Sequence, residues 1–152
     1  MHPLAAHLLK VVGVGLAGLV GIVGIPILVF AFLFSGANEL CGNSPILEVP
    51  SPNGKLKAVV FERDCGATTG FATHVSVIEA ASSLPNEGGN LFVADSNHNA
   101  APSGAGGGPS VQVAWVGPSA LRIEHHPLAR IVRAEPSAFG VKVQYVPPRA
   151  NG

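Results

Sequence analysis

The chain is poor in charged residues and in cysteine, and it carries no cluster of basic residues. Only 12% of its 152 residues are charged, and nine Lys and Arg stand against nine Asp and Glu. A protein that binds nucleic acid needs a basic face to neutralise phosphates, so this composition argues against a nucleic-acid partner. The length leaves room for one compact domain after the apolar N-terminal run.

Common catalytic and metal-binding motifs are also lacking. Neither G-x-S-x-G nor H-E-x-x-H occurs, which removes the commonest hydrolase signatures. His125 and His126 would point to opposite faces of a strand and cannot readily share a metal ion, although His125 could pair with His98 or His74. Residues 95–99 match the start of a calcium-binding loop, but the glycine and the bidentate glutamate of such a loop are missing. The sequence therefore predicts no metal site and no cofactor.

Charge is absent from residues 11–34, where apolar residues are interrupted only by glycine and proline. As a helix this run would be about 36 Å long, enough to cross a bilayer with some tilt. It also exceeds the roughly 7–15 apolar residues of a typical signal peptide. The run predicts an uncleaved transmembrane helix, a signal anchor. Cleavage by a signal peptidase after Ala37 is the alternative.

The flanking charges give the predicted orientation. Lys10 lies just before the apolar run and Glu39 lies just after it. Because Lys and Arg favour the cytoplasmic side, residues 1–10 are predicted to be cytoplasmic and the chain after the helix to be exported. This predicts a single-pass protein of the inner (cytoplasmic) membrane, with the lipid bilayer as a partner and a domain in the periplasm or outside the cell.

Small residues recur at a spacing of four in the apolar run. Gly13, Ala17 and Gly21 would lie on one face of the helix, a pattern that lets two membrane helices approach closely. This face predicts a homodimer. The alternative is that glycine is simply common in membrane helices and the spacing carries no meaning.

After the apolar run we expect a linker over residues 35–52, an exported β domain over residues 53–148 and a tail over residues 149–152. About seven short segments show strand-like apolar patterns separated by turn residues, and residues after 37 show no convincing amphipathic helix. These segments are 55–65, 73–80, 90–95, 111–115, 121–125, 129–134 and 141–146. The pattern predicts a mainly β fold, either an antiparallel sandwich or a strongly twisted sheet.

Two segments of this domain carry more specific expectations. Both alternating faces of residues 55–65 are apolar, which predicts a strand covered on both sides near the centre of its sheet. Residues 96–110 are rich in Gly, Ser, Asn and Pro and hold too little apolar surface to offset the entropy of ordering. They predict a mobile loop, and loops of this length are usually functional or disordered.

Cys41 and Cys65 are the two cysteines of the chain, and an even count in an exported domain predicts a disulfide bond. In the chain-entropy model this bond would stabilise the fold by on the order of 3 kcal/mol. It would tie the linker to the end of the first long strand. The alternative is a reactive Cys65 with His74 as its base and Asp64 beside it.

The densest polar stretch of the chain is F-E-R-D-C-G-A-T-T-G-F, residues 61–71. With S-P-N-G-K at 51–55 ahead of it and T-H-V-S at 73–76 after it, the stretch resembles a family of small, largely uncharacterised bacterial envelope proteins with a membrane-anchored domain. The resemblance covers residues 41–95. Because that family has no established activity, the resemblance implies an anchored, exported domain and assigns no catalytic residue.

The same stretch is the candidate ligand or partner loop. Arg63 and Asp64 could form an ion pair at the strand end, and the Thr68 and Thr69 hydroxyls could brace a turn whose N–H groups face an anion. The stretch lacks the lysine and the following helix of a phosphate-binding P-loop. A small-ligand-binding or enzymatic domain that uses these residues together with His74 is therefore the alternative hypothesis for the function.

The leading hypothesis is a non-enzymatic domain that contacts another protein of the cell envelope. It follows from the predicted anchor, the strand pattern and the missing catalytic motifs. The contact surface is expected in the loops at residues 66–71 and 96–110, because binding residues are concentrated on loops held by a rigid scaffold.

Overall fold

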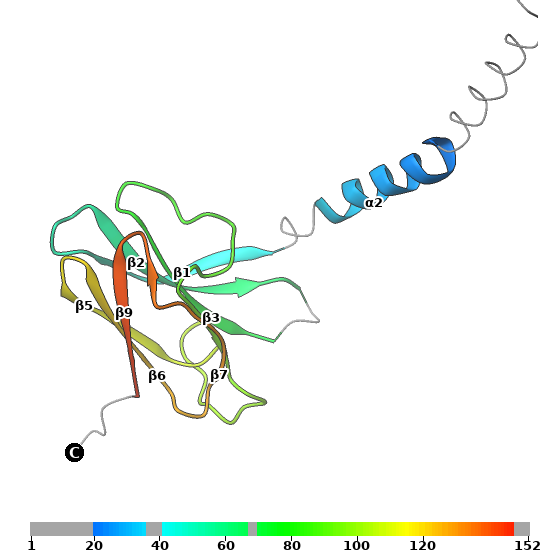
Figure 1. The fold of residues 1–152 in the computed structure, drawn as a ribbon. Coiled ribbons are helices and arrows are strands. Elements are labelled where there is room, and N and C mark those ends of the chain that lie inside the picture. Colours follow the sequence, from blue (N-terminus) through cyan, green and yellow to red (C-terminus); the bar gives the residue numbers. More distant parts are fainter. Residues whose placement is uncertain (1–19, 36–40, 67–69, 148–152) are drawn as a thin grey trace, which may run out of the picture. The chain divides into compact units, whose positions relative to one another are not determined.

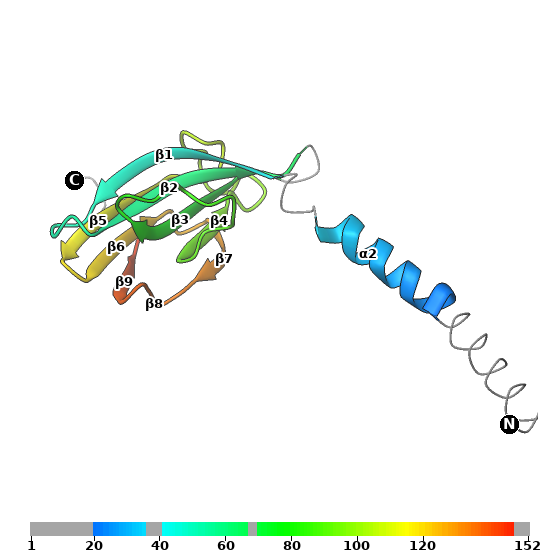
Figure 2. The same ribbon diagram turned by 90° about the horizontal axis from the view of Figure 1, so that it is seen from above.

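The structure is a computed structural model that describes residues 20–35, 41–66 and 70–147 (Figures 1 and 2). The chain divides into two compact units, residues 1–38 and residues 39–152. The first contributes helix and the second contributes strands, and each is described separately below.

The described part of the first unit is helical and apolar. A π-helical turn, η1 (Val20–Gly24), leads directly into the α-helix α2 (Ile25–Ser35). Pro26 stands in the first turn of α2, where its missing N–H is tolerated, and its ring disfavours regular α-helical bonding in the turn before it. Apolar side chains such as Ile25, Leu28 and Phe30 are exposed along this segment. Apolar residues thus occur on every side of the helix.

The transmembrane helix predicted for residues 11–34 is described only from residue 20 onward. Within the described ranges, no helix combines the length and the apolar character needed to cross a membrane. Gly21 lies in η1, whereas Gly13 and Ala17 fall outside the described residues. The anchor and the homodimer through this glycine face remain predictions.

The second unit is a β sandwich of two sheets. The first sheet has the order β1-β2-β3-β4-β7 and is antiparallel throughout. Its strands are β1 (Gly42–Pro50), β2 (Leu56–Asp64), β3 (Ala72–Glu79), β4 (Phe92–Asp95) and β7 (Arg130–Ala134). The second sheet has the order β5-β6-β9-β8. Its strands are β5 (Val111–Gly117), β6 (Ala120–His125), β8 (Ser137–Ala138) and β9 (Val141–Val146).

The main core lies between the two sheets. Alternate residues of β2, β3 and β4 face alternate residues of β6 and β9, as strand geometry requires. The fully buried members include Val60, Val75, Phe92, Leu121 and Ile123. This packing of side chains from both sheets confirms the sandwich and rules out a single twisted sheet.

The outer face of the first sheet is covered as well. Val59, Phe61 and Ile78 form a second buried cluster, and Leu84 from the loop between β3 and β4 packs against it. β2 lies between β1 and β3 and is buried on both faces from Ala58 to Phe61. The prediction of a strand covered on both sides is confirmed at residues 58–61, and β2 is an interior strand of its sheet, next to the edge strand β1.

The described residues contain nine strands, two more than the sequence predicts. β1 lies within the predicted linker. Pro45 and Pro50 hide its strand-like sequence pattern. An edge strand tolerates proline because one side of its backbone has no ladder partner. β8 has only two residues. The expectation of a wholly antiparallel domain is also wrong at one pair, because β6 and β9 are parallel.

The disulfide between Cys41 and Cys65 is confirmed, with an S–S distance of 2.03 Å. The register of β1 and β2 pairs Gly42 with Asp64, so the two cysteines stand next to each other just beyond the ladder. The bond therefore closes the end of the β1–β2 pair. It ties the chain just before β1 to the end of β2.

The loop predicted to be mobile packs on the sheet in its second half. Pro109 is fully buried and pairs with Ser103, and the Thr73 hydroxyl of β3 donates to the Pro109 carbonyl at 2.7 Å. A Cβ at Gly108 would lie 2.6 Å from both the backbone nitrogen and Oγ1 of Thr73. The glycines that suggest disorder in the sequence instead allow a close approach of two backbones.

Candidate functional site

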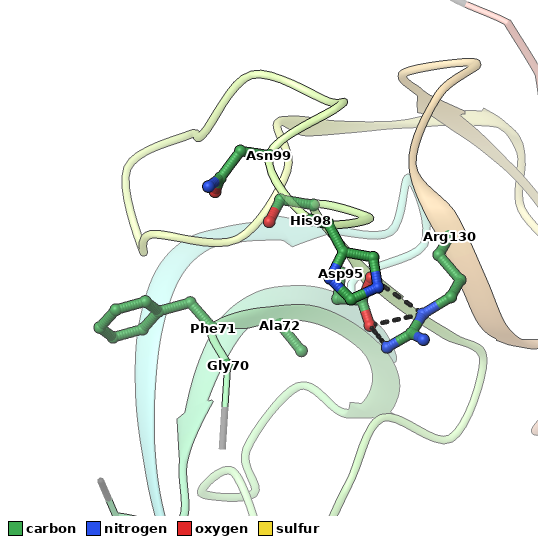
Figure 3. Close-up of a pocket in the computed structure, with 8 residues that line it drawn as sticks. Gly70, Phe71, Ala72, Asp95, His98, Asn99 and Arg130 are labelled. Atoms are coloured by element: carbon green, nitrogen blue, oxygen red, sulfur yellow. Dashed lines mark hydrogen bonds and ion pairs between the residues drawn. The ribbon is translucent and has the colours of Figure 1, made fainter. Parts of the chain in front are cut away.

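An open pocket of 390 Å³ lies at one end of the first sheet (Figure 3). Three segments distant in sequence build it: the start of β3, the turn after β4 and the start of β7. Its lining residues are Gly70, Phe71, Ala72, Asp95, Ser96, His98, Asn99 and Arg130. The pocket thus brings part of the loop before β3 together with the first half of the loop after β4.

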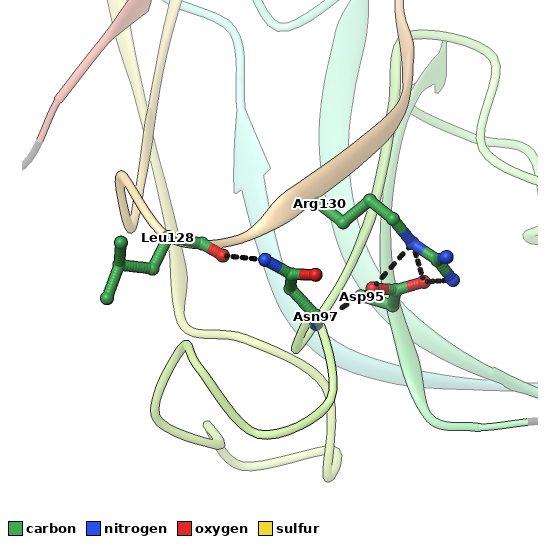
Figure 4. A network of polar contacts seen from close by, with 4 residues as sticks. All are labelled: Asp95, Asn97, Leu128 and Arg130. Atoms are coloured by element: carbon green, nitrogen blue, oxygen red, sulfur yellow. Dashed lines mark hydrogen bonds and ion pairs between the residues drawn. The ribbon is translucent and has the colours of Figure 1, made fainter.

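An ion pair between Asp95 and Arg130 lies on one side of the pocket. The two residues are direct cross-strand partners in the β4–β7 ladder. The Arg130 guanidinium donates from Nε to Oδ1 at 3.2 Å and to Oδ2 at 2.9 Å, and from Nη2 to Oδ2 (Figure 4). Hydrogen bonding from Arg130 holds the pKa of Asp95 below its ordinary value, so this carboxylate stays ionised.

The turn after β4 has an unusual backbone. Asn97, His98 and Asn99 all have positive φ, at 49°, 55° and 69°. Non-glycine residues in this region cost on the order of 1–3 kcal/mol each, although asparagine tolerates it best. The Asn97 N–H donates to Asp95 Oδ1 at 2.9 Å, and its side-chain amide donates to the Leu128 carbonyl at 3.2 Å (Figure 4). These bonds fix the turn so that His98 and Asn99 line the pocket.

Phe71 lies across the pocket from the ion pair (Figure 3). Its side chain is 55% exposed, which is uncommon for so large an apolar group. A Cβ at Gly107 would lie 2.7 Å from the Phe71 Cγ, so the ring packs directly on the backbone of the loop after β4. The two loops predicted to make partner contacts therefore meet at this ring.

Among the predicted site residues that the structure describes, Arg63, Asp64 and His74 do not line the pocket. Arg63 donates to the side-chain oxygens of Asn43 at 2.8 Å and Asn86 at 3.1 Å, and the Asp64 carboxylate accepts the Gly66 N–H at 2.8 Å. These contacts brace the end of β2 and its turn. Thr68 and Thr69 lie outside the described residues.

His74 is part of the fold and not of an exposed site. It is 8% exposed, stacks on Phe61 and accepts the Gly89 N–H at Nδ1 over 3.0 Å. Burial, aided by the nearby positive charges of Arg63 and Arg133, lowers the pKa of His74 to about 4. With Cys65 in a disulfide, the alternative of a reactive Cys65 activated by His74 is wrong.

The histidines considered for metal binding occupy separate environments. His125 stacks on Phe92, His98 lines the pocket and His74 packs on Phe61. The described ranges contain no group of three His, Cys, Asp or Glu side chains placed to hold a metal ion. The Asp95 carboxylate is directed toward the Arg130 guanidinium (Figure 4).

Comparisons with protein-family models, with curated proteins and with solved structures give no match for this chain. The resemblance to envelope proteins thus rests on the sequence around residues 61–71. Sequence reasoning missed Arg130 and the role of Asp95 as its partner. The two residues lie 35 positions apart, so only the pairing of β4 with β7 reveals the ion pair.

Proposed function

We propose that this protein is a membrane-anchored, exported β domain that acts by binding another envelope protein and not by catalysis. The apolar helical segment supports an anchor, because a helix that is apolar on all sides is suited to lipid or to a protein core. The Cys41–Cys65 bond supports export, since disulfides persist in oxidising compartments and are rare in the cytosol.

One of the two edges of the first sheet, the one formed by β7, carries the proposed binding role. β7 is the last strand of that sheet and is exposed along its whole length. Val132 is the extra residue of a bulge opposite Val93 and Ala94, and its side chain is 64% exposed. Exposed apolar residues on an edge strand offer a partner both side-chain surface and backbone hydrogen-bonding groups.

We define the β7 edge as Leu128, Ile131 and Val132, which are 53%, 45% and 64% exposed. The partner is proposed to be a protein with an apolar surface or strand that covers these residues. This surface differs from the loops favoured by the sequence. Phe71 of the first of those loops packs on Gly107 of the second, and the second packs on β3 through Gly108 and Pro109, whereas β7 is exposed along its whole length.

The environments of the candidate catalytic residues support a non-catalytic role. A general base must reach its substrate and have a pKa near the working pH. His74 is buried with a pKa of about 4, and Arg63 and Asp64 brace a turn. Cys65 is oxidised.

Site-specific photocrosslinking in intact cells tests this proposal. A photoreactive phenylalanine analogue at Val132 should give a discrete adduct with a second envelope protein. The same analogue at Lys55, an exposed position in the β1–β2 turn, is the matched control and should give no such adduct. Equal labelling at both positions, or none at Val132, would contradict the assignment of the partner surface.

A further inference from the structure

We propose that the pocket beside the Asp95–Arg130 ion pair binds the ring of a neutral saccharide. Its volume of 390 Å³ lies in the range of about 300–1,000 Å³ found for small-ligand sites. The site is separate from the β7 edge assigned to the protein partner. It therefore adds a second binding activity to the one proposed above.

Charge in the pocket disfavours ionic ligands. Its lining includes one carboxylate and one guanidinium, and these are hydrogen-bonded to each other. The ionised Asp95 would repel a phosphate or carboxylate that approached Arg130, and the guanidinium would repel a cation that approached Asp95. A neutral ligand is repelled neither by the Asp95 carboxylate nor by the Arg130 guanidinium.

The two walls of the pocket differ in chemistry, and the difference matches a sugar ring. The Phe71 side chain forms an exposed aromatic wall, and its electron-rich face suits the weakly positive C–H groups of a pyranose. The hydrogen-bonding wall consists of groups of Ser96, His98, Asn99 and Arg130. Of these, His98 and Arg130 lie across the pocket from Phe71 (Figure 3). A purely apolar ligand would bury these polar groups without partners, whereas vicinal hydroxyls can both donate to them and accept from them.

The hydrogen-bonding wall is held in place before any ligand arrives. The left-handed turn is fixed by the Asn97 bonds to Asp95 and Leu128, and the ion pair fixes the start of β7. Arg130 uses Nε and Nη2 toward Asp95, yet its side chain is 60% exposed, so the guanidinium remains accessible to ligand hydroxyls. Such preorganisation reduces the entropy lost on binding.

Saturation-transfer NMR with the full chain tests the proposal. The protein is kept in a detergent without a sugar headgroup, and the probes are glucose, galactose, mannose and N-acetylglucosamine, each with its disaccharides. At least one probe should receive saturation on the C–H protons of one ring face, with a dissociation constant on the order of 1 mM. No transfer to any probe at about 20 mM would overturn the saccharide assignment.

Variants locate the site and separate binding from folding. Phe71→Ala should weaken binding of the responding probe about tenfold, a change of about 1.4 kcal/mol. Phe71→Tyr should keep the binding, because it retains an aromatic ring for the sugar to stack on. Phe139→Ala removes another exposed phenylalanine and should change nothing. Asn99→Gly keeps the left-handed backbone, removes the amide and should also weaken binding. Unchanged binding in both Phe71→Ala and Asn99→Gly would contradict the proposal. These binding measurements do not test the protein contact at Val132, which the crosslinking experiment tests separately.

Discussion

Replacing Gly108 by alanine should destabilise the β domain strongly. The new Cβ would lie 2.6 Å from the Thr73 nitrogen, 2.6 Å from Thr73 Oγ1 and 2.8 Å from the Ala72 carbonyl carbon. Two of these atoms are backbone atoms of β3, which cannot move without disturbing the sheet. The loop must therefore lift away from β3.

The expected cost follows from two effects. Overpacking of this kind costs about 1–3 kcal/mol. Lifting the loop also breaks the buried 2.7 Å hydrogen bond from Thr73 to Pro109, which contributes about 0.5–1.5 kcal/mol. The free energy of unfolding should fall by about 2–4 kcal/mol, or about 1–2 M in the urea midpoint at a slope of about 2 kcal/mol/M.

Urea unfolding of the full chain, followed by the emission of Trp115, measures this change. Trp115 is the single tryptophan, and its Nε1 donates to the Val49 carbonyl at 2.9 Å, so its signal reports the contact between β5 and β1. Gly117→Ala is the control, because its Cβ would meet only Ala120 Cβ at 3.9 Å. Equal midpoints for the two variants would refute the packing of residues 103–110 on β3.

Three further outcomes follow from the disulfide, His74 and Tyr145. Replacing Cys41 and Cys65 by serine should lower the free energy of unfolding by about 3 kcal/mol, and a thiol assay on the unreduced wild-type chain should find no free thiol. Because the pKa of His74 is about 4 when folded and 6.5 ordinarily, the free energy of unfolding should fall by on the order of 2–3 kcal/mol between pH 6.5 and 4. His74→Gln should flatten this part of the pH profile. An unchanged profile would mean that a group other than His74 causes the loss of stability. Burial, aided by Glu135, raises the pKa of Tyr145 to about 12, so an absorbance titration of this single tyrosine should have its midpoint near 12. The stabilisation from its protonated hydroxyl should be lost as the pH rises from 10 to 12, and a midpoint of 10 would contradict its bonds to Leu91 and Glu135.

Local patterns in the sequence were sufficient to predict most strands and the disulfide. The doubly apolar pattern around Val59 and Val60 reflects burial on both faces, and period-two alternation marks β5 and β6 because one face of each meets the core. The disulfide is predicted from the even count of cysteines together with the expected export of the domain.

Features that depend on contacts distant in sequence escaped the same reasoning. β1 carries prolines that only an edge position permits, and its edge position follows from its single partner, β2. Gly108 looks like a residue of a disordered loop until the Thr73 backbone is placed against it. Arg130 carries no local signal at all, because its partner Asp95 reaches it through the order of the strands.

The pocket depends both on local sequence patterns and on contacts between residues distant in sequence. Phe71 stands in the stretch that sequence reasoning selected, and Asp95 in the stretch that resembled a calcium loop. Neither stretch predicts the pocket alone, since Arg130 and the left-handed turn at 97–99 complete it. Strain at a fixed turn is a common property of binding sites.

A dual reporter fused after Gly152 tests the central claim, that the β domain is exported on an uncleaved anchor, most directly. In a bacterial host, a reporter active only outside the cytoplasm should be active, a reporter active only inside should be silent, and the fusion should sediment with membranes at full length. The opposite reporter pattern, with Gly152 in the cytoplasm, would contradict the exported domain and remove the rationale for the Cys41–Cys65 bond.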